Sequence, residues 1–168
     1  MSAMVNPVFV RTMAAYNAEM NRRIYSAAGR IPDAERRKDR SAFWGSLHGT
    51  LCHLLWGDRM WMSRFDGWEK PDVAQKQSAA LIEDFDELQH QRVDADKKIS
   101  AWAGHVDDAW LAQDQVWFSA SVQKELRQPR GLLVTHFFNH QTHHRGQAHA
   151  IITACGEKTG DTDLFLIV

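Results

Sequence analysis

Histidines are the residues of this sequence whose type and spacing best suit chemistry. The sequence has nine of them, and five fall within positions 131–155, where apolar residues recur three or four apart as in a helix. The apolar stripe of this segment begins at Leu133 and Phe137. Continuing the same spacing places His140 and His144 on the stripe, which should face the protein core.

Two imidazoles on a core stripe each need a polar partner, because a buried polar group without one costs roughly 1–3 kcal/mol. Positions i and i+4 lie on one helical face, so His140 and His144 can share a single metal ion. His136 and His143 fall at the flank of the stripe. We expect these two side chains to lie beside the ligands or to face a substrate.

A metal ion in a helical core also needs a ligand from a facing helix. The segment 41–65 offers His48 and His53, which point in directions about 140° apart on a helix. His53 shares its face with small residues that leave room for an ion and its ligands, namely Ser46, Gly49 and Gly57. The sequence therefore predicts a metal site built from His53, His140 and His144.

Three neutral imidazoles suit Zn²⁺, Ni²⁺, Fe²⁺ or Co²⁺, and few carboxylates lie nearby to favour Mg²⁺ or Ca²⁺. Three protein ligands leave a position open for water or substrate, which is typical of catalytic zinc sites. The alternative is that hydrogen bonds alone hold these histidines in the core. A di-iron carboxylate site is excluded because it needs two Glu-x-x-His motifs, and the sequence has one, from Glu87 to His90.

Four segments with helical periodicity must position the histidines: 6–28, 41–65, 78–102 and 131–155. Asp39 or Ser41 is the expected N-cap of the second helix, and Gly156 is the expected C′ residue of the fourth. The runs 115–119 and 121–125 predict a short hairpin between helices three and four. The expected fold class is all-α, a four-helix bundle with this short hairpin.

Length and composition fit a single domain over residues 1–168. Of the 168 residues, 44% are hydrophobic and 24% are charged, which excludes disordered and fibrous chains. The net charge of −1 argues against a nucleic-acid-binding protein. The sequence shows no secretory signal and no stretch apolar enough for a membrane span, and two cysteines are too few for a disulfide framework. We therefore expect a cytoplasmic protein with neither a membrane nor a nucleic-acid partner.

Two stretches of the sequence carry a resemblance to a known family. CHLLWGDRMW at positions 52–61 and FNHQTHHRGQ at positions 138–147 resemble the second-helix and last-helix motifs of the DinB-like (YfiT-type) metalloenzyme family. The order and separation of the motifs fit as well, so the resemblance covers most of the chain. It implies a four-helix bundle, often dimeric, with a divalent metal held by three histidines, which fall on His53, His140 and His144.

Members of that family include transferases and isomerases that use low-molecular-weight thiols. The resemblance thus implies a metal-dependent enzyme, a transferase or hydrolase, that activates a thiol or water for attack on a small electrophile. We expect a small-molecule substrate, a low-molecular-weight thiol as cosubstrate, and a homodimer. The alternative is a non-catalytic metal-binding protein of the stress response.

No catalytic residue beyond the metal ligands can be assigned from the sequence. The residues expected to line the pocket or to support the ligands are Trp56, Trp61, Arg64, His136 and Gln147. Arg92 lies on the core stripe of the third helix. We expect it either to reach an anionic substrate or to extend its charged group into water.

Overall fold

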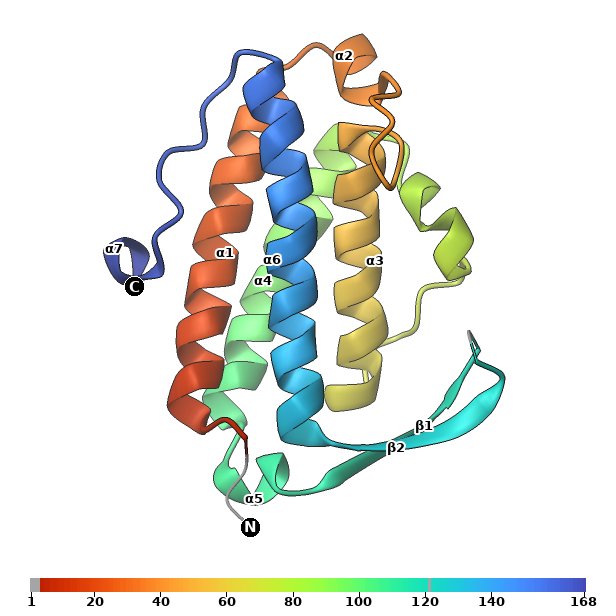
Figure 1. The fold of residues 1–168 in the computed structure, drawn as a ribbon, viewed down its shortest axis with the longest axis vertical. Coiled ribbons are helices and arrows are strands. Elements are labelled where there is room, and N and C mark those ends of the chain that lie inside the picture. Colours follow the sequence, from red (N-terminus) through yellow and green to blue (C-terminus); the bar gives the residue numbers. More distant parts are fainter. Residues whose placement is uncertain (1–3, 121) are drawn as a thin grey trace.

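The computed structural model describes residues 4–120 and 122–168. This part of the chain is mostly helical and has one small sheet of two antiparallel strands (Figure 1). The four longest helices are α1 (Pro7–Gly29), α3 (Leu47–Phe65), α4 (Phe85–His105) and α6 (Arg130–Ala154). The shorter elements are α2 (Asp33–Arg37), the 3-10 helix η1 (Gln75–Ala80), α5 (Asp108–Leu111), β1 (Asp114–Ser119), β2 (Lys124–Pro129) and α7 (Leu164–Ile167). The predicted all-α class is confirmed in this broad sense. None of the described helices is long and apolar enough to cross a membrane.

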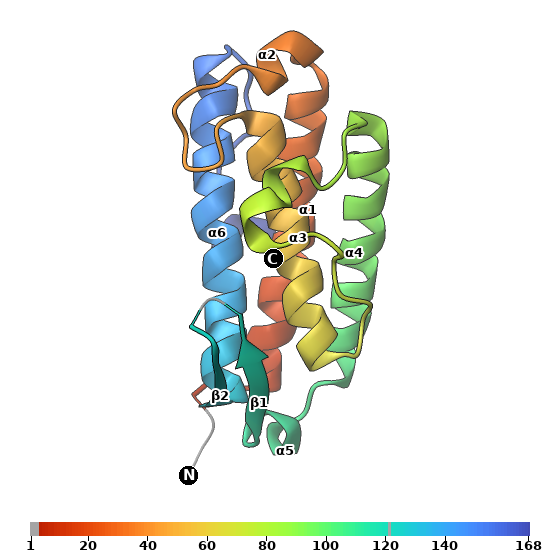
Figure 2. The ribbon, with the colours of Figure 1, turned by 90° about the vertical axis from the view of Figure 1, so that its right-hand side faces the viewer.

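The four long helices lie side by side, and their directions are shown in Figures 1 and 2. α1 and α6 run one way, and α3 and α4 run the other way. α1 contacts α4 and α6, and α3 contacts the same two helices. Because α3 and α4 are parallel, residues 66–84 must travel back along the molecule between them. We call residues 66–84 the return segment; it contains η1, which packs against α3.

α3 begins at Leu47, later than the apolar pattern predicts. Its N-cap is Ser46, whose Oγ accepts a hydrogen bond of 3.0 Å from the Gly49 amide. The expected caps, Asp39 and Ser41, form a turn instead. Asp39 Oδ1 accepts from the Ser41 amide at 2.8 Å, and Ser41 has a φ of 53°. The predicted start is wrong because side-chain bonding to the backbone, which periodicity does not report, sets the first turn.

Replacing the true cap should weaken the fold measurably. We expect Ser46→Ala to lower the free energy of unfolding by about 1 kcal/mol, because the Gly49 amide loses its acceptor. Ser41→Gly is the matched control and should change stability little, since glycine tolerates a positive φ. Urea unfolding curves with equal slopes check this. A loss for Ser41→Gly as large as that for Ser46→Ala would contradict the assignment.

α4 also begins later than predicted. The expected helix started at position 78, but α4 starts at Phe85, where Asp84 Oδ1 accepts from the Glu87 amide at 2.8 Å. Positions 78–80 belong to η1. The apolar spacing continues from η1 into α4. A prediction based on that spacing therefore gives one helix where the structure has two separate elements.

The other predicted elements lie close to their expected positions. α1 and α6 each start and end within one residue of 6–28 and 131–155. Gly156 follows α6 with a φ of 86°, as expected of a C′ glycine. The hairpin is present, but its second strand begins at Lys124 rather than at Ser121, which lies outside the described residues.

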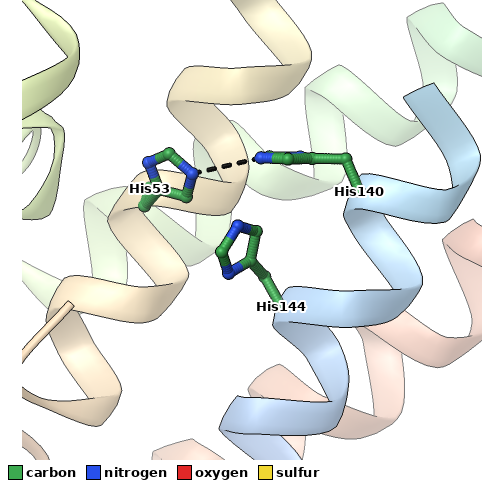
Figure 3. Close-up of side chains that lie close together, drawn as sticks. All are labelled: His53, His140 and His144. Atoms are coloured by element: carbon green, nitrogen blue, oxygen red, sulfur yellow. Dashed lines mark hydrogen bonds between the residues drawn. The ribbon is translucent and has the colours of Figure 1, made fainter. Parts of the chain in front are cut away.

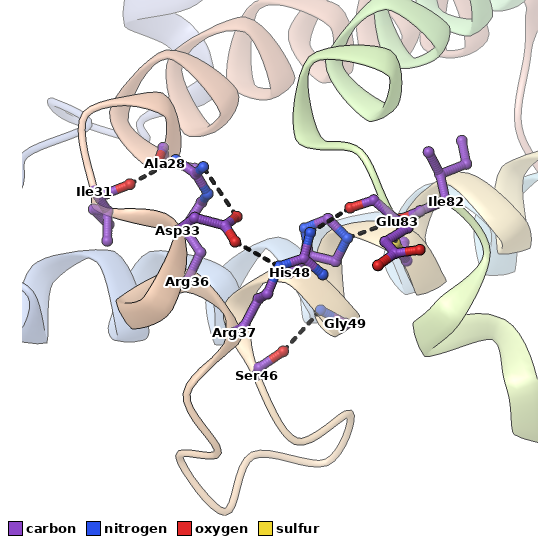
Figure 4. Close-up of polar contacts among 11 residues, drawn as sticks. Ala28, Ile31, Asp33, Arg36, Arg37, Ser46, His48, Gly49, Ile82 and Glu83 are labelled. Atoms are coloured by element: carbon purple, nitrogen blue, oxygen red, sulfur yellow. Dashed lines mark hydrogen bonds and ion pairs between the residues drawn. The ribbon is translucent and has the colours of Figure 1, made fainter.

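A basic segment before α3 fastens the end of α1 to the return segment (Figure 4). Arg36 donates to two carbonyls at and just after the end of α1, and Arg37 donates to the carbonyl of Glu83. The ring of His48, in the first turn of α3, bonds through Nε2 to the carbonyl of Ile82 at 2.8 Å. These contacts make His48 a structural histidine and hold the return segment beside α3.

One charged network joins all four long helices inside the core. Arg92 of α4 is 2% exposed and pairs with Asp58 of α3 and, at 2.8 Å, with Asp96. Asn21 of α1 donates to Asp96 at 2.9 Å, and Gln141 of α6 donates to Asp58 at 2.7 Å. The apolar core forms two clusters, and along α3 the network falls between them. Arg92 does not extend its charged group into water, so that expectation is wrong: two carboxylates neutralise its charge within the core.

Candidate metal centre

The structure brings three histidines together between α3 and α6 (Figure 3). His53 comes from α3, and His140 and His144 come from successive turns of α6. Each residue offers one ring nitrogen, and these three nitrogens all lie within 4.8 Å of one another. His53 and His144 are buried, whereas His140 is partly exposed. No other His, Cys, Asp or Glu of the described residues joins this group.

The spacing of the ring nitrogens fits a transition-metal ion. His53 Nε2 and His140 Nε2 are 3.2 Å apart. Two imidazole nitrogens that bind zinc tetrahedrally lie about 3.3 Å from each other, because each bond is about 2.0–2.1 Å long. The centre of the His144 ring lies 4.5 Å from that of His140 and 4.6 Å from that of His53. A set of three imidazoles is a donor set that Zn²⁺, Ni²⁺ and Fe²⁺ accept.

Side chains behind two of the rings orient the nitrogens that face the centre. Gln147 Oε1 is 2.7 Å from His144 Nδ1. An amide oxygen only accepts, so His144 Nδ1 carries the proton and Nε2 keeps its lone pair. Ser78 Oγ lies 2.8 Å from His53 Nδ1 and can hold that ring in the same way. Metal-binding histidines commonly have such partners. Gln147 was expected on this side of α6, whereas Ser78 comes from η1 and was not anticipated.

Gly57 gives the His140 ring its space. A Cβ atom at this position would lie 2.7 Å from His140 Cε1, so any side chain here would push the ring aside. His140 Nδ1 is buried and has no hydrogen-bond partner among the described residues. Close packing and the contact with His53 Nε2 therefore position this ring, whereas side chains outside the cluster hold the other two rings by hydrogen bonds. Gly57 was expected to leave room for an ion and its ligands, and it leaves room for the ring of His140.

The cluster is uncharged near neutral pH. Burial lowers the pKa of His53 to about 3, and the neighbouring His144 and His140 lower it further. Burial lowers the pKa of His140 to about 3 as well, again helped by its histidine neighbours. The pKa of His144 is also lowered by burial, although the hydrogen bond that its Nδ1 donates to Gln147 opposes this. Neutral imidazole is the form that binds metal.

These lowered pKa values predict metal binding that resists mild acid. Protons compete with a metal only below the pKa of the metal-free ligand. Three histidines with a pKa near 6.5 would therefore lose about 500-fold in affinity between pH 7 and pH 5.5. We expect the zinc affinity of this protein to fall less than about tenfold over that interval. Calorimetric titration with Zn²⁺ at both pH values checks this, and a loss of several hundredfold would contradict the lowered pKa values.

Two tryptophans cover the His53 ring. The Trp44 ring, from the turn before α3, stacks on it with 3.8 Å between ring centres, and the Trp56 ring lies 5.8 Å away. Trp56 Nε1 donates to the carbonyl of Val73 in the return segment at 2.9 Å. Trp44 Nε1 is buried and has no partner among the described residues. Trp56 was an expected pocket residue, whereas Trp44 lies in irregular structure, where no periodicity could point to it.

The three remaining pocket candidates lie together one helical turn from His140. The exposed His136 ring is 6.0 Å from the His140 ring and 5.1 Å from the Trp61 ring, centre to centre. The guanidinium of Arg64 lies 4.5 Å from the centre of the Trp61 ring. Partial desolvation lowers the pKa of His136, and the charge of Arg64 lowers it further. This group therefore adjoins His140, the partly exposed member of the histidine cluster.

Two large surface hollows lie elsewhere and do not include His53, His140 or His144. One of about 760 Å³ lies along α3 and α4 and is lined by Arg59, Trp68 and Trp102 among others. Another, of about 480 Å³, lies between α1 and α4 and includes Tyr25 and Arg92. Neither gathers donor atoms around a point as the three histidines do, so we assign the site by its donor atoms rather than by cavity size.

Comparisons with known proteins bear on the whole chain. No curated protein and no solved structure matches it. A sequence profile of the DinB family matches residues 1–167. That match includes both helices that carry the histidine cluster and nearly the full length of 168 residues. The chain therefore belongs to the DinB family.

Proposed function

We propose that this protein is a metal-dependent enzyme in which His53, His140 and His144 hold a divalent transition metal, Zn²⁺, Ni²⁺ or Fe²⁺. The enzyme activates a thiol or water for attack on a small electrophile, in the manner of a thiol transferase. The observation that carries the proposal is the cluster itself. Three neutral imidazoles converge with a nitrogen spacing of 3.2 Å between two of them. Side chains behind two of the rings orient them toward a common point.

The number of protein ligands supports catalysis rather than a structural role. Structural zinc sites have four protein ligands, whereas catalytic sites keep one position open. The described residues supply three. Cys52, next to His53 in sequence, points elsewhere, because its Sγ donates to the carbonyl of Ile82 at 3.3 Å.

When bound, the metal supplies Lewis acidity, which lowers the pKa of a thiol or water on it. The protein's own residues do the rest. Ser78 and Gln147 keep two rings oriented, and Trp44 and Trp56 shield the His53 ring from water. The Trp44 indole N–H is a buried donor without an acceptor among the described residues.

We further propose that the four long helices form a four-helix bundle domain that assembles as a homodimer in the cytoplasm. Apolar side chains on α7 are exposed, with Phe165 at 78% and Leu166 at 64%, and a second subunit would cover them. Both cysteines are unpaired, as is usual in a reducing compartment. Light scattering at micromolar protein tests the assembly, and a monomer mass would refute the dimer.

Conjugation assays test the enzymatic proposal. Metal-loaded protein is mixed with glutathione or cysteine and an activated aryl halide, and in parallel with an activated ester to detect attack by water. We expect turnover that chelation abolishes, that added metal restores, and that His140→Ala lacks. Bound metal without turnover on any substrate would overturn the enzymatic proposal and favour a non-catalytic metal-binding protein.

A further inference from the structure

Arg64 is a partly buried cation whose side chain contacts aromatic faces among the described residues. Its guanidinium carbon lies 4.5 Å from the centre of the Trp61 ring and 5.3 Å from that of the Trp117 ring. Burial lowers its pKa. No hydrogen bond or ion pair links the Arg64 side chain to any of the described residues. Its guanidinium thus loses hydration without gaining an anion or another hydrogen-bond acceptor.

Two other arginines are buried more deeply than Arg64, and each of them has a hydrogen-bond acceptor. Arg92 pairs with two carboxylates, and Arg145 donates to the side chain of Asn17. A cation withdrawn from water is costly unless an acceptor compensates it. At Arg64 the ring faces give part of that compensation. Its N–H groups have no acceptor within residues 4–120 and 122–168.

The contacts of Arg64 suit it for binding an oxyanion. The guanidinium carbon lies over the faces of two rings that are inclined at 66° to each other. Ring faces attract the cation but accept no ordinary hydrogen bond, so the N–H donors are left for an anion. Trp61 comes from α3 and Trp117 from β1, so the helix and the hairpin together hold the guanidinium between two rings. A guanidinium edge matches the two oxygens of a carboxylate or a phosphate group in a fork of parallel hydrogen bonds.

This guanidinium stands close to the histidine cluster. The Trp61 ring touches the His136 ring, and the His136 ring lies one turn of α6 from His140. A molecule that reached from Arg64 to His140 would cross the Trp61 and His136 rings. Those rings favour an apolar or aromatic body between the two ends.

We propose that Arg64 is the anion-binding residue of a substrate subsite beside the three histidines. The substrate class is a small organic molecule in which an oxyanion, a carboxylate or a phosphate ester, is attached to an apolar body. Arg64 binds the oxyanion, and Trp61 and Trp117 hold the guanidinium in place. The position of the electrophilic end at the histidines rests on the proposed function, whereas the anion binding itself does not.

Calorimetric titration with three probes of similar shape tests the subsite. The probes are benzoate, phenyl phosphate and neutral benzamide, each added to zinc-loaded and to metal-free protein. We expect Arg64→Gln to weaken binding of at least one anion about tenfold or more, and to leave benzamide unchanged. Arg64→Lys should retain part of the affinity, because it keeps the charge but loses the fork. Arg11→Gln, at an exposed arginine of α1, is the matched control and should bind as wild type does.

Equal affinity of wild type and Arg64→Gln for both anions would overturn the subsite, and so would an equal loss in Arg11→Gln. Which anion depends on Arg64 identifies a carboxylate or a phosphate substrate. Arg64-dependent binding in a protein that never takes up metal would keep the subsite and remove the proposed enzyme. Metal-dependent turnover together with anion binding that does not depend on Arg64 would keep the proposed enzyme and remove the subsite. Circular dichroism of both Arg64 variants confirms folding.

Discussion

His140→Ala and His144→Ala should each reduce bound metal from about one equivalent to almost none. Each variant leaves two imidazoles, and two ligands seldom retain a transition metal against buffer and dialysis. His53→Ala should do the same, although its ring comes from another helix. Elemental analysis of tag-free protein, after reconstitution with Zn²⁺, Ni²⁺ and anaerobic Fe²⁺, measures this directly.

Two further variants test whether the loss of metal is specific to the three ligands. His143→Ala removes an exposed histidine beside His144 in sequence and should keep its metal. Ser78→Ala should keep one equivalent but bind it about 10–100-fold more weakly, because the partner of His53 Nδ1 is lost. Full metal content in His140→Ala would remove this ring from the ligand set. Absence of metal in wild type would return all three histidines to a structural role in the core.

The second large effect is expected at the buried network. Arg92→Met leaves Asp58 and Asp96 without their cation and should lower the free energy of unfolding by about 3–5 kcal/mol at pH 7. That is a large part of the stability of an ordinary domain. Guanidinium chloride unfolding measures the loss. Arg22→Met, which breaks an exposed pair with Glu19, is the control and should change stability little.

The pH dependence of that loss separates charge from packing. Burial raises the pKa of Asp96 to about 6, against the opposing charge of Arg92, and removing Arg92 raises it further. The folded state therefore takes up a proton at Asp96 more readily than the unfolded state does. The Arg92→Met defect should accordingly be smaller at pH 5 than at pH 7. A defect of equal size at both pH values would mean that lost packing, and not unpaired charge, causes it. Asp96→Asn gives a milder second variant if Arg92→Met does not fold.

The three histidines could be found from the sequence because residues three or four apart lie on the same face of a helix. Apolar spacing on α6 placed His140 and His144 on the core stripe, and small neighbours pointed to His53. The same reasoning could not find Ser78 or Trp44. Both reach His53 from segments without regular spacing, and their positions depend on how the chain crosses the helices.

The boundaries that were missed share a different cause. Ser46 and Asp84 start α3 and α4 by bonding to backbone amides, while the apolar pattern extends further back in both cases. Arg92 was recognised as a core position, but one of its partners, Asp58, lies on another helix. Pairing across helices depends on their packing, which periodicity along one helix does not contain. A charged residue on a core stripe therefore indicated a buried network whose members the sequence could not name.

The parallel course of α3 and α4 has a consequence for the lifetime of a bound ion. The return segment has few regular backbone hydrogen bonds, and such segments open at a lower free-energy cost than long helices do. Its opening would withdraw Ser78 from the His53 ring while α3 and α6 stayed folded. Local opening of the return segment, rather than unfolding of the helices, would then set the rate at which the metal ion dissociates. Hydrogen exchange at η1 should accordingly slow when metal is bound.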